Sequence, residues 1–92
     1  MTEIDVTARS KADGWTCTVQ LADTNGSRTS HEVWVGREDL ARLAPGADHP
    51  VDLVRRSFEF LLAREPKESI LRSFELPAIG RYFPEYERVI RA

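Results

Sequence analysis

The sequence has little of the chemistry that marks most small enzymes and metal-binding domains. Its single cysteine, Cys17, excludes an intrachain disulfide and cannot by itself build a structural zinc site. There are only two histidines, and no glycine-rich loop is followed by the Lys-Ser or Lys-Thr pair of a phosphate-binding loop. We therefore expect no cofactor, no metal and no catalytic residues, and we interpret the chain as a non-enzymatic protein.

Long apolar runs and a charge excess of one sign are also missing. No stretch approaches the roughly 18 consecutive apolar residues of a transmembrane helix, and the first residues lack the features of a secretory signal. The formal net charge is −2, with about −3 in residues 1–50 and +1 in residues 51–92, unlike a domain built to bind phosphates. Arginine greatly outnumbers lysine, which is typical of a GC-rich genome. We expect a bacterial, cytoplasmic protein with no membrane partner.

What is present fits one small domain, which we assign to residues 1–92. Apolar residues make up 41% of the chain and charged residues 30%, too apolar for obligate disorder. In a domain of 92 residues without a disulfide or a metal, the free energy gained by burying the core is nearly cancelled by the loss of chain entropy on folding. The chain is therefore expected to gain stability from a partner, either as a homodimer or with another protein.

Residues 1–35 alternate between apolar and polar side chains, a period of two that predicts β-strands. The pairs Asp13-Gly14 and Asn25-Gly26 mark tight turns between three such runs. We predict an antiparallel meander with Val19, Val33 and Val35 in the core. Because a lone small sheet is marginal in water, one of its faces must be covered.

The period changes at Gly36, and residues 37–65 are predicted to form two helices. The first runs from Arg37 to Ala44. The second is the main helix, with Asp48 as its N-cap, about 15 residues, and an end near Glu65-Pro66. Its apolar stripe, which includes Phe58 and Leu61, is the expected cover for the sheet. The predicted fold class is α+β: a three- to four-stranded antiparallel sheet covered on one face by one main helix.

The C-terminal segment, residues 66–92, is ambiguous. Residues 69–76 fit either a fourth strand or a helical face, and we favour an extended segment. Pro77 and Pro84 are each expected to begin a short helix or turn.

The run from Glu65 to Leu76, continued through Ile79 into Tyr82-Phe83-Pro84-Glu85-Tyr86-Glu87, resembles the C-terminal signature of a family of small uncharacterised bacterial proteins. This resemblance implies no activity and therefore no site residues. A sheet followed by a helix is also similar in topology to HicB-type antitoxin domains, although the glycine-rich strand ending of that family is absent here.

Two alternatives to a pure interaction protein remain open. A Cys-dependent hydrolase would need Cys17 and His31 to meet across neighbouring strands. A nucleic-acid-associated or antitoxin-like regulator would use an arginine-bearing helix face, although acidic residues at salt-bridge spacing accompany those arginines. We interpret the first pair as core residues and the second set as a solvated helix face.

The leading hypothesis is a protein-interaction or structural module that self-associates. Tyrosine and arginine, which are enriched at binding hot spots, crowd the C-terminal segment. The same rings could instead fix the chain end to the core, and one ring can do both. The residues assigned to the contact surface are Trp34, Arg81, Tyr82, Phe83, Tyr86 and Arg88.

Overall fold

The alternating segment forms three long strands in the computed structural model, which describes residues 2–91. They are β1 (Thr2–Lys11), β2 (Gly14–Asp23) and β3 (Arg28–Gly36), and each pairs with the next in antiparallel fashion. A fourth strand, β4 (Ser73–Glu75), joins the far side of β3, so the order across the sheet is β1-β2-β3-β4. The predicted α+β class and the meander are confirmed.

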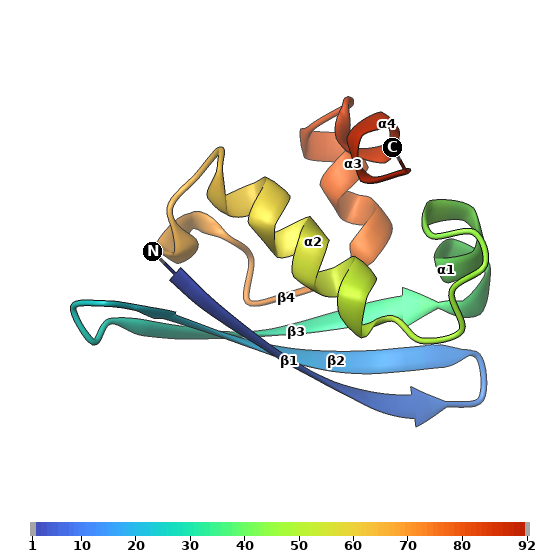
Figure 1. The fold of residues 1–92 in the computed structure, drawn as a ribbon, viewed down its shortest axis with the longest axis horizontal. Coiled ribbons are helices and arrows are strands. Elements are labelled where there is room, and N and C mark those ends of the chain that lie inside the picture. The colour runs from blue at the N-terminus through green and yellow to red at the C-terminus, as the bar shows by residue number, and fades with distance from the viewer. Residues whose placement is uncertain (1, 92) are drawn as a thin grey trace.

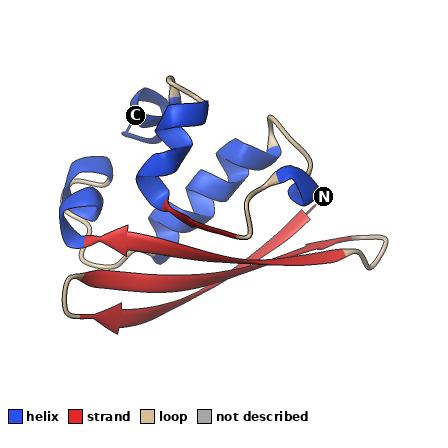
Figure 2. Cartoon of the chain, turned by 180° about the vertical axis from the view of Figure 1, so that it is seen from behind, coloured by secondary structure: helices blue, strands red, loops and turns tan. Residues whose placement is uncertain are grey.

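One face of this sheet is apolar and the other is polar, as the alternation requires. Figures 1 and 2, which view the molecule from opposite sides, show the helices on a single side of the sheet. The predicted core residues Val19, Val33 and Val35 are buried on that side. The opposite face carries outward-facing polar side chains such as Thr16, Thr18 and Glu32, and none of the helices or strands of residues 2–91 covers it.

Two helices follow the meander. Helix α1 (Arg37–Leu43) buries Leu40 and Leu43, and helix α2 (Val51–Leu62) crosses the sheet. The predicted N-cap was wrong. Pro50 occupies that position without a side-chain cap, and the Val51 amide donates to His49 Nδ1 at 3.5 Å. The helix also ends at Leu62, earlier than expected. Within residues 2–91, no helix is long and apolar enough to cross a membrane.

Helix α2 is buried on two sides rather than one. Phe58 and Leu61 are buried, as predicted, and on the sheet side the centroid of the Phe58 ring lies 5.5 Å from that of the His31 ring. Phe60 and Ser57 are also buried, although both lie off the apolar stripe seen in the sequence. They face the helices α3 (Ile79–Tyr82) and α4 (Tyr86–Arg91), which lie beyond α2 as seen from the sheet.

The segment that fits either a strand or a helix contains both an extended strand and helical turns, each three residues long. A 3₁₀ turn, η1 (Lys67–Ser69), leads into the three-residue strand β4, and a second turn, η2 (Leu76–Ala78), follows at once. Strand β4 runs parallel to β3, with Val33 opposite Phe74. The expectation of a purely antiparallel sheet is corrected here, because the chain crosses over through α2 before it returns to the sheet.

Gly14 has a different role from the one its Asp-Gly pair suggests. The turn is Ala12-Asp13, neither of which has a positive φ, and Gly14 already belongs to β2, opposite Gly36. A Cβ at Gly14 would overlap the carbonyl oxygen of Val35 and lie 2.9 Å from the Gly36 Cα. The Trp34 ring lies over this glycine pair on the outer face, an aromatic cover that replaces the missing side chains.

The Gly14→Ala variant is expected to be less stable than the wild type by about 1–3 kcal/mol, because the methyl group must displace the β3 backbone. Gly80→Ala in α3 is the matched control, since nothing lies within 4 Å of a Cβ there and φ is not positive. Urea denaturation of the two variants tests this. Equal stability for both would contradict the close approach of β2 and β3.

Candidate functional site

An apolar pocket of about 320 Å³ opens between the end of α2 and the C-terminal segment. It begins beside β4 at the edge of the sheet and is closed on the other side by α3. Leu61 and the residues Ile70, Ala78 and Ile79 form buried walls. The remaining lining residues are Glu65, Ser69, Leu71, Phe74, Tyr82 and Phe83.

The rim of this pocket exposes large apolar side chains. Tyr82 is 67% exposed and Leu71 is 49% exposed, which makes them two of the three large hydrophobic residues at the surface of the described chain. Glu65 is half-buried in the lining and forms no ion pair within residues 2–91. The pocket thus combines apolar walls with one unpaired carboxylate.

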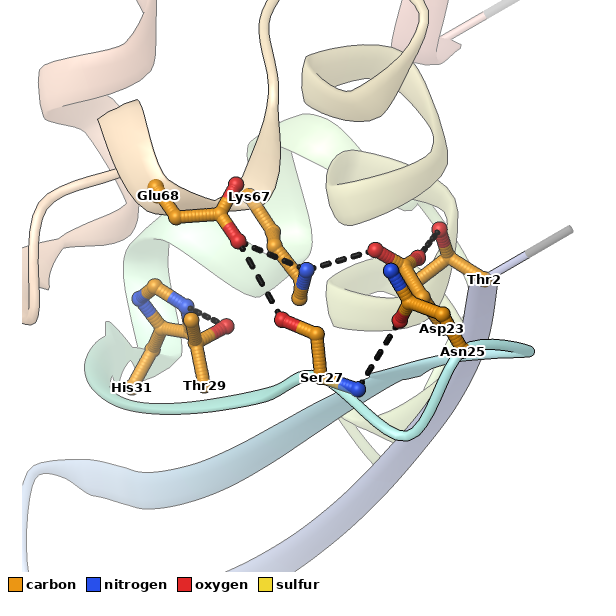
Figure 3. Close-up of polar contacts among 8 residues, drawn as sticks. All are labelled: Thr2, Asp23, Asn25, Ser27, Thr29, His31, Lys67 and Glu68. Atoms are coloured by element: carbon orange, nitrogen blue, oxygen red, sulfur yellow. Dashed lines mark hydrogen bonds and ion pairs between the residues drawn. The ribbon is translucent and has the colours of Figure 1, made fainter.

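A buried lysine fixes the segment that forms one wall. Lys67 in η1 is only 4% exposed, and its Nζ donates to Asp23 at 2.5 Å and to Glu68 at 2.7 Å. Figure 3 shows the ammonium group between the two carboxylates, with the Thr2 hydroxyl donating to Asp23 at 2.6 Å. Lys67 holds the pKa of the Asp23 carboxyl below its usual range, and its own pKa is raised by the same hydrogen bonds.

His31 makes the second connection to this segment. One ring nitrogen, Nδ1, lies 2.7 Å from the Leu71 carbonyl oxygen, and Nε2 lies 2.9 Å from the Thr29 hydroxyl. A carbonyl oxygen only accepts, so Nδ1 is the donor to Leu71, and in the neutral imidazole Nε2 then accepts from the Thr29 hydroxyl. The imidazole therefore anchors the rim residue Leu71 to β3, next to the backbone bond from the Glu32 amide to the Arg72 carbonyl.

Tyr86 ties α4 to α2. Its hydroxyl lies 2.7 Å from the Ser57 hydroxyl, which in turn donates to the Leu53 carbonyl oxygen at 2.8 Å. The Tyr86 hydroxyl is therefore the donor to Ser57. Burial raises the pKa of Tyr86 to about 12. Its ring packs edge-on against that of Phe60, with 5.3 Å between the ring centroids, so Tyr86 fixes the chain end to the core.

The predicted contact residues do not form one surface. Tyr82 and Phe83 line the pocket, and Arg81 is exposed next to them. Arg88 is exposed on α4, and Tyr86 is 1% exposed, so it takes the anchoring role that the sequence left open. Trp34 lies on the opposite, uncovered face of the sheet, where its ring packs over Gly14 and Gly36.

The Cys17–His31 pair is not assembled for catalysis. Cys17 is opposite Val33 and His31 is opposite Val19, so the two side chains are diagonal neighbours with no hydrogen bond between them. The thiol is fully buried, and burial raises its pKa to about 11. Both ring nitrogens of His31 already have partners. Among residues 2–91, no three His, Cys, Asp or Glu side chains are grouped to hold a metal ion.

Most of the arginines of the predicted helix face make contacts within the chain. Arg56 pairs with Asp52 at 3.0 Å, and it also donates to the Ile90 carbonyl oxygen. The guanidinium carbon of Arg64 lies 3.6 Å from the centroid of the Phe60 ring, and Arg64 also pairs with Glu85. Arg55 donates to the Ile4 carbonyl oxygen at 2.7 Å. These contacts connect α2 to β1 and to the chain end, and they leave Arg72 as the exposed member whose guanidinium makes no hydrogen bond or ion pair within the described chain.

Four residues important to the pocket were not singled out from the sequence: Glu65, Lys67, Leu71 and Phe74. A signal existed for Lys67, because it is one of only two lysines in an arginine-rich chain. Its ammonium group carries three N–H donors on a flexible stem, so one lysine can serve two carboxylates at once. Leu71 and Phe74 lie in residues 69–76, whose apolar spacing fits both a strand and a helix, so the sequence alone does not assign their faces.

No protein-family model, curated protein or solved structure matches this chain. The resemblance of its C-terminal segment to small bacterial proteins therefore stays a prediction, and the site is interpreted from its own geometry.

Removing Lys67 is expected to destabilise the fold more than removing an exposed arginine. Lys67→Met leaves Asp23 and Glu68 without their cation, whereas Arg9→Met breaks the exposed Arg9–Glu32 pair, which contributes about 1 kcal/mol or less. The carboxylate pKa values are lowered in the folded state, so this stabilisation is present above about pH 5 and is lost as the pH falls through them.

Urea denaturation of the wild type and both variants at several pH values measures this. The gap between the wild type and Lys67→Met should be constant near neutral pH and should shrink below about pH 4. A gap no larger than that of Arg9→Met would contradict a structural role for Lys67.

The Cys17 thiol is expected to react slowly with a disulfide reagent at neutral pH. Its raised pKa and full burial should make the reaction about 100-fold or more slower than in urea-unfolded chain. Stopped-flow absorbance with glutathione as the control measures the rate. A thiol that reacts as fast as glutathione would restore the hydrolase hypothesis.

Proposed function

We propose that the chain is a protein-interaction module that accepts an apolar side chain of a partner in the pocket between α2 and α3. The observation that carries this proposal is the pairing of an open apolar pocket with a rim of exposed Leu71 and Tyr82. Isolated surface hydrophobics need no explanation, but clustered ones around a concavity mark binding sites.

The size of the pocket limits what it can do alone. Burying one leucine or phenylalanine side chain contributes about 1.5–3 kcal/mol, less than the roughly 4 kcal/mol of even a millimolar complex. The partner must therefore extend over the rim, where Leu71 and Tyr82 offer further apolar area and Arg81 offers a charge. We infer a weak, reversible complex with an extended peptide segment rather than a tightly enclosed small molecule.

The charge in the pocket lining further restricts the kind of partner that the pocket can bind. Glu65 is the one carboxylate in the pocket lining and it has no ion-pair partner within residues 2–91. A peptide with a lysine or arginine beside its apolar anchor would pair with it in a partly dry site, where such pairs contribute more than at an open surface. The proposed ligand class is thus a protein segment with an aromatic or leucine anchor next to a basic residue, bound in the cytosol.

Selection of a displayed random-peptide library on the full chain tests this proposal. Selected peptides should carry the apolar-basic pattern and should shift the amide resonances of residues 61–83. The Leu71→Glu variant should weaken their binding by about tenfold or more, since it places a charge in the apolar contact. Tyr82→Ala, a milder change at an exposed site, should weaken it in the same direction.

Val89→Glu is the matched control. Val89 is exposed to a similar extent, 44%, but does not line the pocket, so this variant should bind the peptides as the wild type does. Peptides that bind all variants equally, or a selection that yields no pocket-binding peptide, would overturn the proposal.

A further inference from the structure

The two edges of the sheet differ greatly. Strand β4 has three residues, but β1 has ten, and all ten pair with β2 in an unbroken register. Proteins commonly protect an edge strand with a proline, a bulge or a short length. Strand β1 has none of these. Arg55 occupies the Ile4 carbonyl oxygen, but the outer edge from Val6 to Ser10 is a regular template for another strand.

The hairpin geometry identifies the backbone groups on that edge. The turn has two residues, so Lys11 and Gly14 form the first hydrogen-bonded pair and the odd-numbered residues of β1 bond to β2. The even-numbered residues then direct their amides and carbonyls outward. Arg55 confirms this direction, because its guanidinium donates to the Ile4 carbonyl oxygen from outside the sheet. Val6, Ala8 and Ser10 have no such contact within residues 2–91.

The inner face of β1 is incompletely covered. Ile4, Val6 and Ala8 point toward α2 but are only half-buried, while the inward residues of β2 and β3 are buried. Next to them on α2, Arg55 and Glu59 are exposed and neither has an ion-pair partner in the described residues. A partner molecule that pairs along this edge would bury these three apolar side chains further.

The charges on the outer face of β1 are divided by sign along the strand. Glu3 and Asp5 lie in its first half, and Arg9 and Lys11 lie in its second half, all on the same face. An antiparallel copy of the same strand, with Thr7 opposite its own counterpart, places Asp5 opposite the partner's Arg9 and Glu3 opposite the partner's Lys11. Two-fold symmetry repeats both pairs, which gives four opposite-charge pairs. Arg9 already pairs with Glu32 of its own sheet, so the partner's Asp5 would be its second carboxylate.

Other arrangements do not match the charges as well. A parallel copy would place each charged residue opposite its own kind, which is destabilising. A shift that puts Val6 opposite its counterpart keeps only the pairs between Glu3 and the partner's Arg9, and leaves Lys11 without an acidic partner. The charge pattern therefore selects one orientation and one register.

We propose that β1 is a homodimer interface, through which two copies pair their first strands antiparallel about Thr7 and form one continuous eight-stranded sheet. In this register the outward amides and carbonyls of Val6 bond to those of the partner's Ala8. The proposal does not depend on the peptide-binding pocket, which lies at the other edge of the sheet beside β4.

Two charge-reversal variants test it in a way that misfolding cannot imitate. Glu3→Lys with Asp5→Lys makes the outer face of β1 wholly basic, and Arg9→Glu with Lys11→Glu makes it wholly acidic. Each variant alone should raise the dimer dissociation constant by about tenfold or more, because like charges face each other. An equimolar mixture of the two should restore the dimer, since the two strands are then complementary.

Sedimentation equilibrium over a micromolar to millimolar series measures the mass, which for the wild type should approach twice 10.5 kDa. Hydrogen exchange gives a second readout: the Val6 and Ala8 amides should be protected in the dimer and exchange quickly in either variant alone. A monomeric wild type, or variants that stay dimeric, would overturn the proposal. Leu71→Glu should leave the dimer intact, so failure of the pocket proposal and failure of this one are separable.

Discussion

The buried ammonium group of Lys67 determines how the last third of the chain meets the sheet. It binds Asp23, 44 positions earlier in the sequence, at the point where β2 ends and where Thr2 also donates to the same carboxylate. A charge this deep is tolerated only when its partners satisfy it, and no side-chain nitrogen or oxygen buried in the described residues lacks a partner. The start of β1, the end of β2 and η1 are thereby joined. The path of residues 70–76, and with it one wall of the pocket, follows from that junction.

Helix α2 supplies the second constraint, because it is packed between the sheet and the C-terminal helices. Phe58 contacts His31 and Phe74 on the sheet side, while Phe60 contacts Phe83 and Tyr86 on the other. In a chain of 92 residues without a disulfide, a helix that serves two interfaces uses its apolar surface fully. The pocket lies where this packing ends, beyond Leu61, since the helix stops before the C-terminal segment can cover the gap.

Structure that depends on local, periodic patterns of side chains could be predicted from the sequence. Structure that depends on contacts between residues far apart in the chain could not. The alternation of Val19, Val33 and Val35 required a buried sheet face, and these residues are buried. Ser57 and Phe60 could not be assigned to a second buried face, because the residues that cover them, Phe83 and Tyr86, come 23 or more positions later. Likewise, Tyr82 and Tyr86 look alike in the sequence. Tyr86 is buried because it donates to Ser57 and packs against Phe60, two partners far away in the sequence, whereas Tyr82 is exposed.

The unequal lengths of the two edge strands bear on how large an assembly this sheet can support. Strand β4 offers three residues before the chain turns away into η2, which begins at Leu76, and these are too few to pair stably with another strand. Only the β1 edge is long enough to be extended, and a symmetric contact there would pair the β1 edges of both copies with each other. In the proposed dimer, addition of subunits would stop after a single step, because no long strand edge would remain unpaired to extend the sheet into a fibre.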